Sequence, residues 1–200
     1  MKHLIEYLDL PPVPAHLCKL TDPMSYPRSN TTTAFCERDG EVIQDADYRR
    51  FPANSELSQW IINNVSSTYT SAGISFHGAP TPQTVCPHSD RRRTVGLLYI
   101  IDPGGPEVDT VFWQEVGYPL SREFAVMPSS YQDLTEVGRY RLVTGTWALL
   151  DTTVIHSVEG LQGLRKTLQI DWMDPALVPY DKIIGTSGED RTLSRTLIWR

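Results

Sequence analysis

The sequence predicts a mainly β protein with one flanking helix. Beyond residue 70, short segments rich in β-branched and aromatic residues alternate with turns such as Pro103-Gly104-Gly105 and Thr144-Gly145. Closely spaced short strands of this kind are typical of a sandwich or a barrel rather than of a parallel α/β sheet. A single stretch near residue 60 has the helical period, and the 200 residues contain no internal repeat or linker. We therefore expect a single domain over residues 1–200.

The elements follow in order along the chain. Residues 1–54 are predicted to form an N-terminal arm and loop, because the prolines between residues 10 and 27 remove backbone donors. Ser55 is the expected N-cap of a helix over 55–65, with Glu56 in its first turn. A β core is predicted over 72–172, followed by a tail over 173–200. Its expected strands span residues 72–76, 95–101, 110–113, 139–143, 147–151 and 167–172, and Trp113, Trp147 and Trp172 on them are interpreted as core residues.

The composition limits the class of function. A formal charge of -6 and a pI near 5.3 give no global attraction to phosphate, so nucleic acid is not an expected partner. Arg91, Arg92 and Arg93 form the strongest basic run. Such a run is usually a solvated loop or strand end, and contact with a substrate is the alternative.

Cysteine usage and hydropathy bear on the compartment. The three cysteines, Cys18, Cys36 and Cys86, are widely spaced and contain no CxxC pair, which favours neither a disulfide framework nor a thiolate zinc site. Glu6 and Asp9 interrupt the apolar N-terminus, and no later stretch has the length of a membrane span. We expect a cytoplasmic protein in a reducing compartment.

Three residues are candidates for binding a metal. In an extended chain His88 and Asp90 lie on the same side, so an imidazole and a carboxylate can converge on one ion. Alone, this H-x-D pair is weak, because a hydrogen-bonded surface turn contains the same residues. A second histidine, His156, ends the β-branched run 151–156 just before an expected Glu-Gly turn at 159–160.

A cation and a hydroxyl follow on one strand. Alternation places Arg165 and Thr167 on one face, whereas Leu164, Lys166 and Leu168 lie on the other. A planar guanidinium makes two parallel hydrogen bonds to a carboxylate, and a threonine hydroxyl adds one more. A salt bridge between Arg165 and the nearby Glu159 is the structural alternative.

The combined pattern resembles the 2-oxoglutarate/Fe(II)-dependent oxygenase superfamily, whose members carry H-x-D…H followed by R-x-S or R-x-T. The matching residues are His88, Asp90, His156, Arg165 and Thr167, with Lys166 at the variable position. The resemblance covers about residues 72–172 and includes the strand-turn-strand pattern over 97–113 and the turn and strand over 144–151. It implies a prolyl-hydroxylase-like double-stranded β-helix, which is a jelly-roll or cupin-like core.

The resemblance also implies a chemistry. Fe(II) would be held by His88, Asp90 and His156, a ligand set that leaves coordination positions open. The co-substrate 2-oxoglutarate would be held by Arg165 and Thr167, with O2 as oxidant and ascorbate as a candidate reductant. Tyr99 is a softer candidate for a contact to the co-substrate carboxylate, and packing in the core is the equal alternative.

The sequence also allows other roles for two residues and other functions for the chain. His77 is expected to be structural or to form part of the substrate wall, and Cys86 is left out of the site because a thiolate would favour zinc. The runner-up function is a non-catalytic cupin-like module that binds a metal or a small acid. A halogenase is disfavoured because Asp90 is present. For the substrate we expect a peptide or amino acid first, a small metabolite second and a nucleobase third, with specificity in the loops over 24–52 and 117–138.

Overall fold

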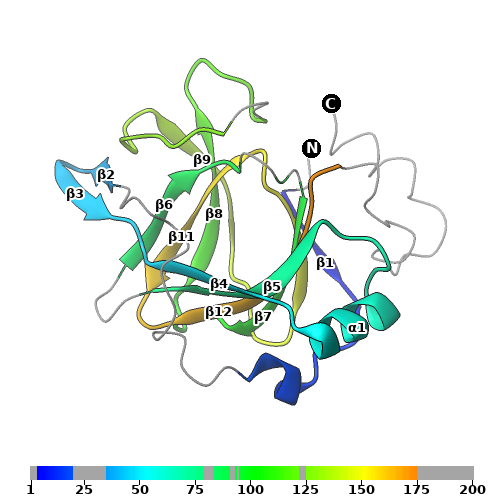
Figure 1. Cartoon of the computed structure of the whole chain (residues 1–200). Coiled ribbons are helices and arrows are strands. Elements are labelled where there is room, and N and C mark those ends of the chain that lie inside the picture. Colours follow the sequence, from blue (N-terminus) through cyan, green and yellow to red (C-terminus); the bar gives the residue numbers. More distant parts are fainter. Residues whose placement is uncertain are drawn as a thin grey trace.

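The structure is a computed structural model that describes residues 4–19, 35–78, 83–90, 93, 95–121 and 125–174 (Figure 1). The 3-10 helix η1 spans Ala15–Cys18 and the helix α1 spans Ser55–Asn64. The strands are β1 (Ile5–Leu8), β2 (Phe35–Arg38), β3 (Glu41–Gln44), β4 (Tyr48–Pro52), β5 (Ser71–His77), β6 (Gln83–His88), β7 (Val95–Asp102), β8 (Asp109–Glu115), β9 (Leu134–Tyr140), β10 (Trp147–Asp151), β11 (Ile155–Leu161) and β12 (Arg165–Trp172).

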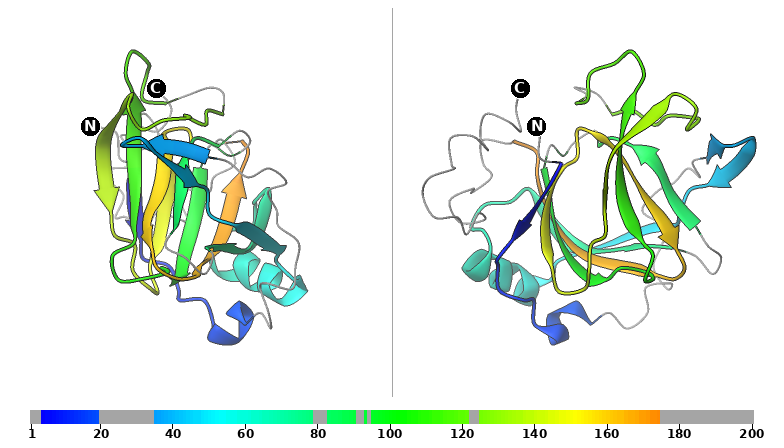
Figure 2. Two further views of the ribbon diagram at one scale, coloured as in Figure 1. Left: turned by 90° about the vertical axis from the view of Figure 1, so that its left-hand side faces the viewer. Right: turned by 180° about the vertical axis from the view of Figure 1, so that it is seen from behind.

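Two antiparallel sheets face each other, as Figure 2 shows. The larger sheet has the order β1-β10-β7-β12-β5-β4, and the smaller one has the order β6-β11-β8-β9. From β5 to β8 the chain alternates between the sheets, and after the β8–β9 hairpin it alternates again through β10, β11 and β12. This winding is that of a jelly roll, so the predicted fold class is confirmed.

The outer face of the larger sheet carries the main apolar core. Leu57 and Ile61 of α1 pack there with Leu168 and Trp172 of β12. The helix begins at the expected residue and ends one residue earlier than expected, at Asn64. Its N-cap is Asn54, and not Ser55, because Asn54 Oδ1 accepts the backbone N–H of Leu57 at 2.8 Å. An amide oxygen there satisfies a donor that the first helical turn leaves open.

The three tryptophans predicted to lie in the core are all buried. Trp147 and Trp172 belong to the cluster on the outer face of the larger sheet, and their indole N–H groups donate to the carbonyls of Pro11 and Thr68. Trp113 packs instead on the smaller sheet, where its N–H donates to Ser157 Oγ. Each ring therefore buries a large apolar area without leaving its donor unpaired.

The N-terminal segment is more ordered than an arm and loop. It contributes β1, which pairs with β10, and β4, which pairs with β5 at the far edge of the same sheet. The hairpin of β2 and β3 lies beside β6. The tail expected over 173–200 is described only for Met173 and Asp174, so most of it lies outside the described residues.

One predicted strand and one predicted turn differ from the structure. The strand expected over 139–143 is β9, which begins five residues earlier and ends at Tyr140. Most of its side chains are exposed at the sheet edge, so the sequence pattern that marks a buried strand is weak there. β11 continues through Glu159 and Gly160 to Leu161, whereas a turn was expected. Gly160 has a φ of 77° and lies where the pairing with β6 changes register.

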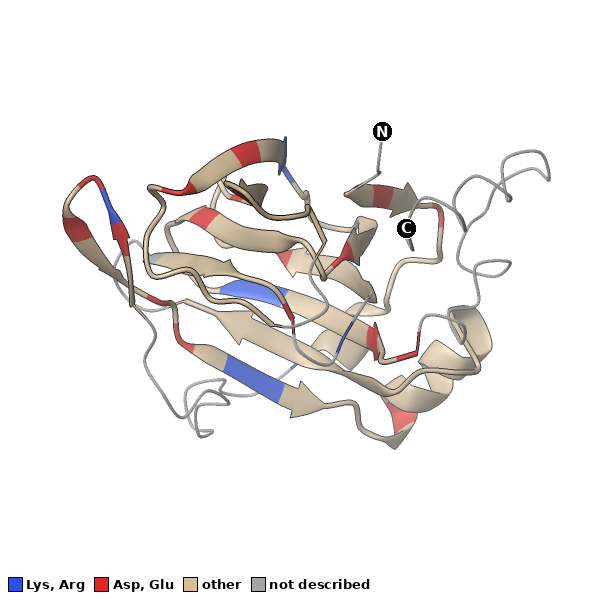
Figure 3. Cartoon of the chain, turned by 90° about the horizontal axis from the view of Figure 1, so that it is seen from above, with Lys and Arg blue, Asp and Glu red and all other residues tan. Residues whose placement is uncertain are grey.

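Charged side chains of both signs are interspersed on the strands (Figure 3). On the smaller sheet they form a connected set: Glu159 pairs with Arg38 at 2.5 Å and with Arg139 at 3.6 Å, and Asp109 pairs with Arg139 and Arg141. Within the described ranges, none of the helices has the length and apolar character needed to cross a membrane.

Candidate functional site

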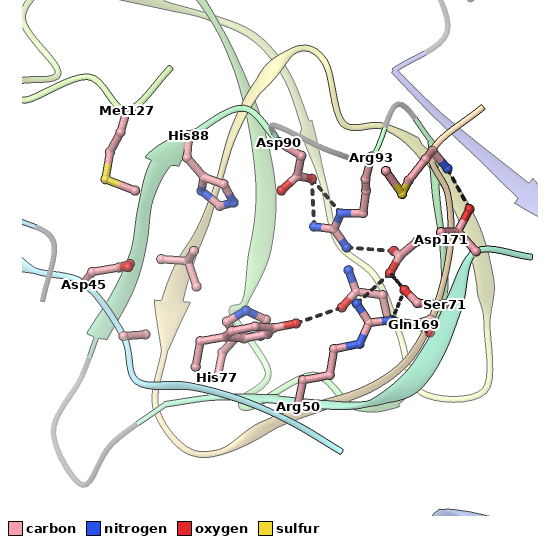
Figure 4. Close-up of a pocket in the computed structure, with 15 residues that line it drawn as sticks. Asp45, Arg50, Ser71, His77, His88, Asp90, Arg93, Met127, Gln169 and Asp171 are labelled. Carbon is pink, nitrogen blue, oxygen red and sulfur yellow. Dashed lines mark hydrogen bonds and ion pairs between the residues drawn. The ribbon is translucent and has the colours of Figure 1, made fainter. Parts of the chain in front are cut away.

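A cavity of about 530 Å³ opens between the two sheets (Figure 4). Its wall includes His77, His88, Asp90, Gln169 and Asp171, which come from β5, β6, the segment after β6, and β12. An apolar cluster that includes Ile100, Phe112 and Leu150 fills another part of the space between the sheets. The interior therefore has one part packed with hydrocarbon and one part that is hollow and lined mostly by polar residues.

The two candidate histidine ligands are neighbours, and His88 lines the cavity. His88 ends β6 and His156 lies near the start of β11, and the two are direct partners across the antiparallel pair. Their ring centroids are 4.6 Å apart. The sequence separates them by almost 70 residues, so the register of β6 and β11 is what brings them together.

Backbone carbonyls fix the orientation of both rings. His88 Nδ1 donates to Cys86 O at 2.8 Å, and His156 Nδ1 donates to Val154 O at 2.9 Å. A carbonyl can only accept, so Nδ1 carries the proton and Nε2 keeps its lone pair when the ring is neutral. Burial, assisted by the neighbouring His88, lowers the pKa of His156 to about 4. At neutral pH His156 thus has the protonation state of a metal ligand.

Asp90 lies beside the histidines but is bound to an arginine. Its Oδ2 is 4.0 Å from His156 Nε2, and the same oxygen accepts Arg93 Nε at 2.8 Å and pairs with Nη2 at 2.7 Å. Burial alone would raise the pKa of Asp90, but Arg93 and the two histidines outweigh it and hold the pKa below its ordinary value. Within the described ranges, no group of three or more His, Cys, Asp or Glu side chains is arranged to hold a metal ion. The triad residues are together, with Asp90 turned to Arg93.

Arg165 is buried without an acidic partner. It starts β12 and is 3 % exposed, and its Nη2 donates across the space between the sheets to Thr110 Oγ1 of β8 at 3.3 Å. Within the described part of the chain no carboxylate reaches it. Glu159, the alternative partner, is bound to Arg38 and Arg139 instead. Burial lowers the pKa of Arg165 to about 10.

The alternation expected along β12 is present. Thr167 is buried on the same face as Arg165, whereas Leu168 belongs to the core on the outer face. Lys166 lies on that outer face too, where its Nζ donates to the carbonyl of Cys18. The strand therefore presents Arg165 and Thr167 to the interior and keeps Lys166 out of it.

Tyr99 does not lie in the site. It is the β7 partner of Leu168, and so it points to the outer face of the larger sheet, away from Arg165 and Thr167. There it packs on Trp147 with ring centroids 5.0 Å apart. The prediction of a co-substrate contact for Tyr99 is corrected by this placement, and its alternative, packing in the core, describes the residue.

The sequence did not predict the connected ion pairs in the cavity wall. Arg93 Nη1 pairs with Asp171 Oδ1 at 3.1 Å, and Arg50 Nη1 pairs with Asp171 Oδ2 at 2.6 Å (Figure 4). Arg93 is largely buried and lines the cavity, which differs from the expected solvated run and agrees with its alternative of a place near the substrate, while Arg91 and Arg92 lie outside the described residues. Asp171 follows Arg165, Thr167 and Gln169 in the alternation of β12, and that phase could have identified it.

His77 contributes to the cavity wall, in line with one of its two expected roles. It is the β5 partner of Arg165, and its ring stacks on Tyr48 with centroids 4.7 Å apart. Burial, with Arg165 and His88 nearby, lowers the pKa of His77 to about 3, so the ring is neutral. Its Nδ1 is buried and has no hydrogen-bond partner among the described residues.

Comparisons with known proteins give low similarity. No protein-family model matches the sequence, and no curated protein matches it either. Solved structures similar to the chain include a 2OG-Fe(II) oxygenase family oxidoreductase from Burkholderia pseudomallei, with 9% identity, a TM-score of 0.40 and 74% of each chain covered. The CENP-C cupin domain of Drosophila melanogaster has 14% identity and a TM-score of 0.33, covering 72% of this chain and 79% of that one. Peruvianin-I, a cysteine peptidase from Thevetia peruviana latex, has 9% identity and a TM-score of 0.38, covering 78% and 73%. Identities and TM-scores this low carry no argument about function.

Proposed function

We propose that this chain is an Fe(II)- and 2-oxoglutarate-dependent dioxygenase. The observation that carries the proposal is that two groups of residues suited to iron and to an acid both lie in the space between the sheets. At one end His88 and His156 lie side by side with Asp90, and at the other a fully buried Arg165 has no carboxylate within the described chain. A buried cation without a carboxylate partner is costly, and an anionic ligand would relieve that cost.

The donor set fits a non-haem iron site. Two neutral imidazoles and one carboxylate would hold the ion through the Nε2 atoms of His88 and His156 and one oxygen of Asp90. The backbone carbonyls of Cys86 and Val154 hold both rings in the required tautomer. When bound, Fe(II) would activate O2, which is the oxidant that converts 2-oxoglutarate to succinate and CO2 and hydroxylates a substrate.

The protein's own groups would orient the co-substrate. Arg165 would bind its far carboxylate through the guanidinium, and Thr167 lies on the same buried face to add a hydroxyl. The cavity of about 530 Å³ would hold the substrate, for which a peptide or amino acid is the first expectation, a small metabolite the second and a nucleobase the third. Ascorbate would keep the iron reduced.

A second candidate is a cupin-like module that binds a metal or a small acid without turnover. The observation in its favour is the pairing of Asp90 with Arg93, which engages the carboxylate that the iron site needs. The two candidates differ in one measurable property, because only the oxygenase converts 2-oxoglutarate to succinate.

The test combines Fe(II) titration with succinate release, with a panel of peptides, amino acids and nucleotides as candidate substrates. His88→Ala, His156→Ala and Asp90→Ala should each lose Fe(II) binding and turnover while circular dichroism stays unchanged. Asp90→Glu should keep some metal but lose turnover, since it displaces the ion by about one methylene. His16→Ala is the matched control, because His16 is exposed and pairs only with Glu56 in the described structure.

The outcomes separate the two candidates. Iron binding that depends on the three residues, together with a weak visible absorption band when 2-oxoglutarate is added without oxygen, supports the oxygenase. Metal binding without that band and without succinate favours the binding module. Succinate production that survives all three substitutions removes the site assignment.

A further inference from the structure

Two cysteines far apart in sequence meet beneath the candidate site. Cys36 lies on β2, and Cys86 lies on β6. Both side chains are buried, and Cys36 Sγ donates to Cys86 Sγ at a distance of 2.7 Å. Two sulfur atoms this close need little movement to come within bonding distance.

The surrounding backbone holds the two thiols in place. Cys36 pairs with Ile43 across the β2–β3 hairpin, and Cys86 Sγ lies 3.9 Å from the carbonyl oxygen of Ile43. The backbone N–H of Cys86 donates to Asp45 Oδ1 at 2.8 Å. The contact therefore belongs to a defined junction between the hairpin and β6, and it is not the meeting of two mobile side chains.

The junction also supports the candidate site. The carbonyl of Cys86 orients the ring of His88, and Asp45 and Ala46, which follow the hairpin, line the cavity. Figure 4 shows Asp45 on the same side of the cavity as His88. A covalent bond at Cys86 would thus fix the backbone that orients His88 and one wall of the cavity.

We propose that Cys36 and Cys86 form a reversible disulfide, so that oxidation joins the β2–β3 hairpin covalently to β6. The oxidant is a small disulfide such as oxidised glutathione. One protein sulfur attacks it to give a mixed disulfide, and the second protein sulfur then displaces the small thiol. In the balance, two protein S–H bonds become one S–S bond, and the oxidant's S–S bond becomes two S–H bonds. This inference does not depend on the proposed oxygenase activity.

The experiment counts thiols in the full chain before and after treatment with oxidised glutathione. Each sample is unfolded, alkylated and measured by intact mass. Reduced protein should take up three alkyl groups and oxidised protein one, on Cys18, which lies in a separate cluster against α1. Peptide mapping should then recover the Cys36–Cys86 link.

Variants make the result specific. Cys18→Ser should take up two alkyl groups when reduced and none when oxidised, whereas Cys36→Ser should keep two under both conditions. The link closes a loop of about 50 residues, so the oxidised wild-type protein should unfold about 5–10 °C higher than the reduced one. Cys36→Ser should show no such shift. Three alkylated cysteines after oxidation, a stable glutathione adduct in place of the link, or a link through Cys18 would each overturn the proposal.

Discussion

From Thr167 onward the two faces of β12 are equally buried and chemically opposite. On the outer face, Leu168, Ile170 and Trp172 are each 0% exposed and pack under α1. The four alternate residues on the inner face, Arg165, Thr167, Gln169 and Asp171, are 3–4% exposed and all polar. Exclusion from water is therefore the same on both sides, and the difference lies in what replaces the water. Burial of the outer face stabilises the fold, whereas burial of the polar groups on the inner face costs free energy of folding.

The residues on the inner face differ in how well their polar groups are paired, and Arg165 is paired least. Gln169 Oε1 accepts Ser75 Oγ at 2.8 Å, and Asp171 is paired with two arginines. Among the described residues, the one side-chain partner of Arg165 is the hydroxyl of Thr110. The inner-face groups with partners stabilise the structure, whereas Arg165, which has no carboxylate partner among the described residues, is the group assigned to the co-substrate in the proposed function.

Trp172→Ala on the outer face should give the largest effect. The change leaves a cavity under α1 and should lower the free energy of unfolding by about 3–5 kcal/mol. Urea denaturation measures it, with Thr167→Val as the inner-face comparison, expected to cost less than about 1.5 kcal/mol. Equal losses for the two variants would contradict the division of labour between the faces.

Arg165→Leu should separate binding from stability. Loss of a charge-assisted hydrogen bond costs about 1.5–3 kcal/mol, so the affinity for 2-oxoglutarate should fall about 10- to 150-fold. Unfolding should change little or become harder, because a buried cation is removed. Binding to the iron-loaded protein and urea denaturation are the two readouts. Lys166→Met, one residue along on the outer face, is the control and should leave the affinity for 2-oxoglutarate within about 2-fold. Equal losses of affinity for both variants would show that 2-oxoglutarate does not bind at Arg165.

The pH dependence of stability tests whether His77 and His156 are neutral in the folded protein. The pKa of His77 is about 3 when folded against 6.5 as its ordinary value, so the unfolded chain binds more protons between these limits. Stability is then complete above pH 6.5 and falls on acidification, by up to about 1.4 kcal/mol per pH unit. Urea denaturation of metal-free protein between pH 4.5 and 7 should show this slope. His77→Gln should flatten it, while the share of His156 remains down to about pH 4. Identical slopes for both proteins would show that His77 is not held neutral.

Thr167→Val should have the smallest effect. Its hydroxyl offers one neutral hydrogen bond, worth about 0.5–1.5 kcal/mol, so the affinity for 2-oxoglutarate should fall about 2- to 10-fold. Thr167→Ser keeps the hydroxyl and should restore most of the affinity. No difference between the valine and serine variants would remove Thr167 from the site.

Sequence reasoning succeeded where alternation was sufficient. The phase of β12 placed Arg165 and Thr167 together and Lys166 opposite, and the H-x-D pair lies beside His156 as expected. The prediction for Tyr99 was wrong because alternation was not sufficient there. The face on which Tyr99 lies depends on the pairing of β7 with β12, which one strand alone does not reveal. Partners such as Arg93 with Asp171, or Cys36 with Cys86, arise from sheet register across 50 or more residues. Local patterns cannot encode such pairings.

In the proposed iron site, the contact of Arg93 with Asp90 would also affect which ion binds. Both nitrogens that Arg93 offers go to Oδ2, so an approaching ion finds only the other oxygen of the carboxylate unengaged by this arginine. Ca²⁺ commonly takes carboxylates through both oxygens and collects six to eight oxygen ligands in all. Here it would meet one oxygen and two imidazoles, a set that suits a smaller transition-metal ion. In the proposed iron site, this contact would therefore disfavour calcium.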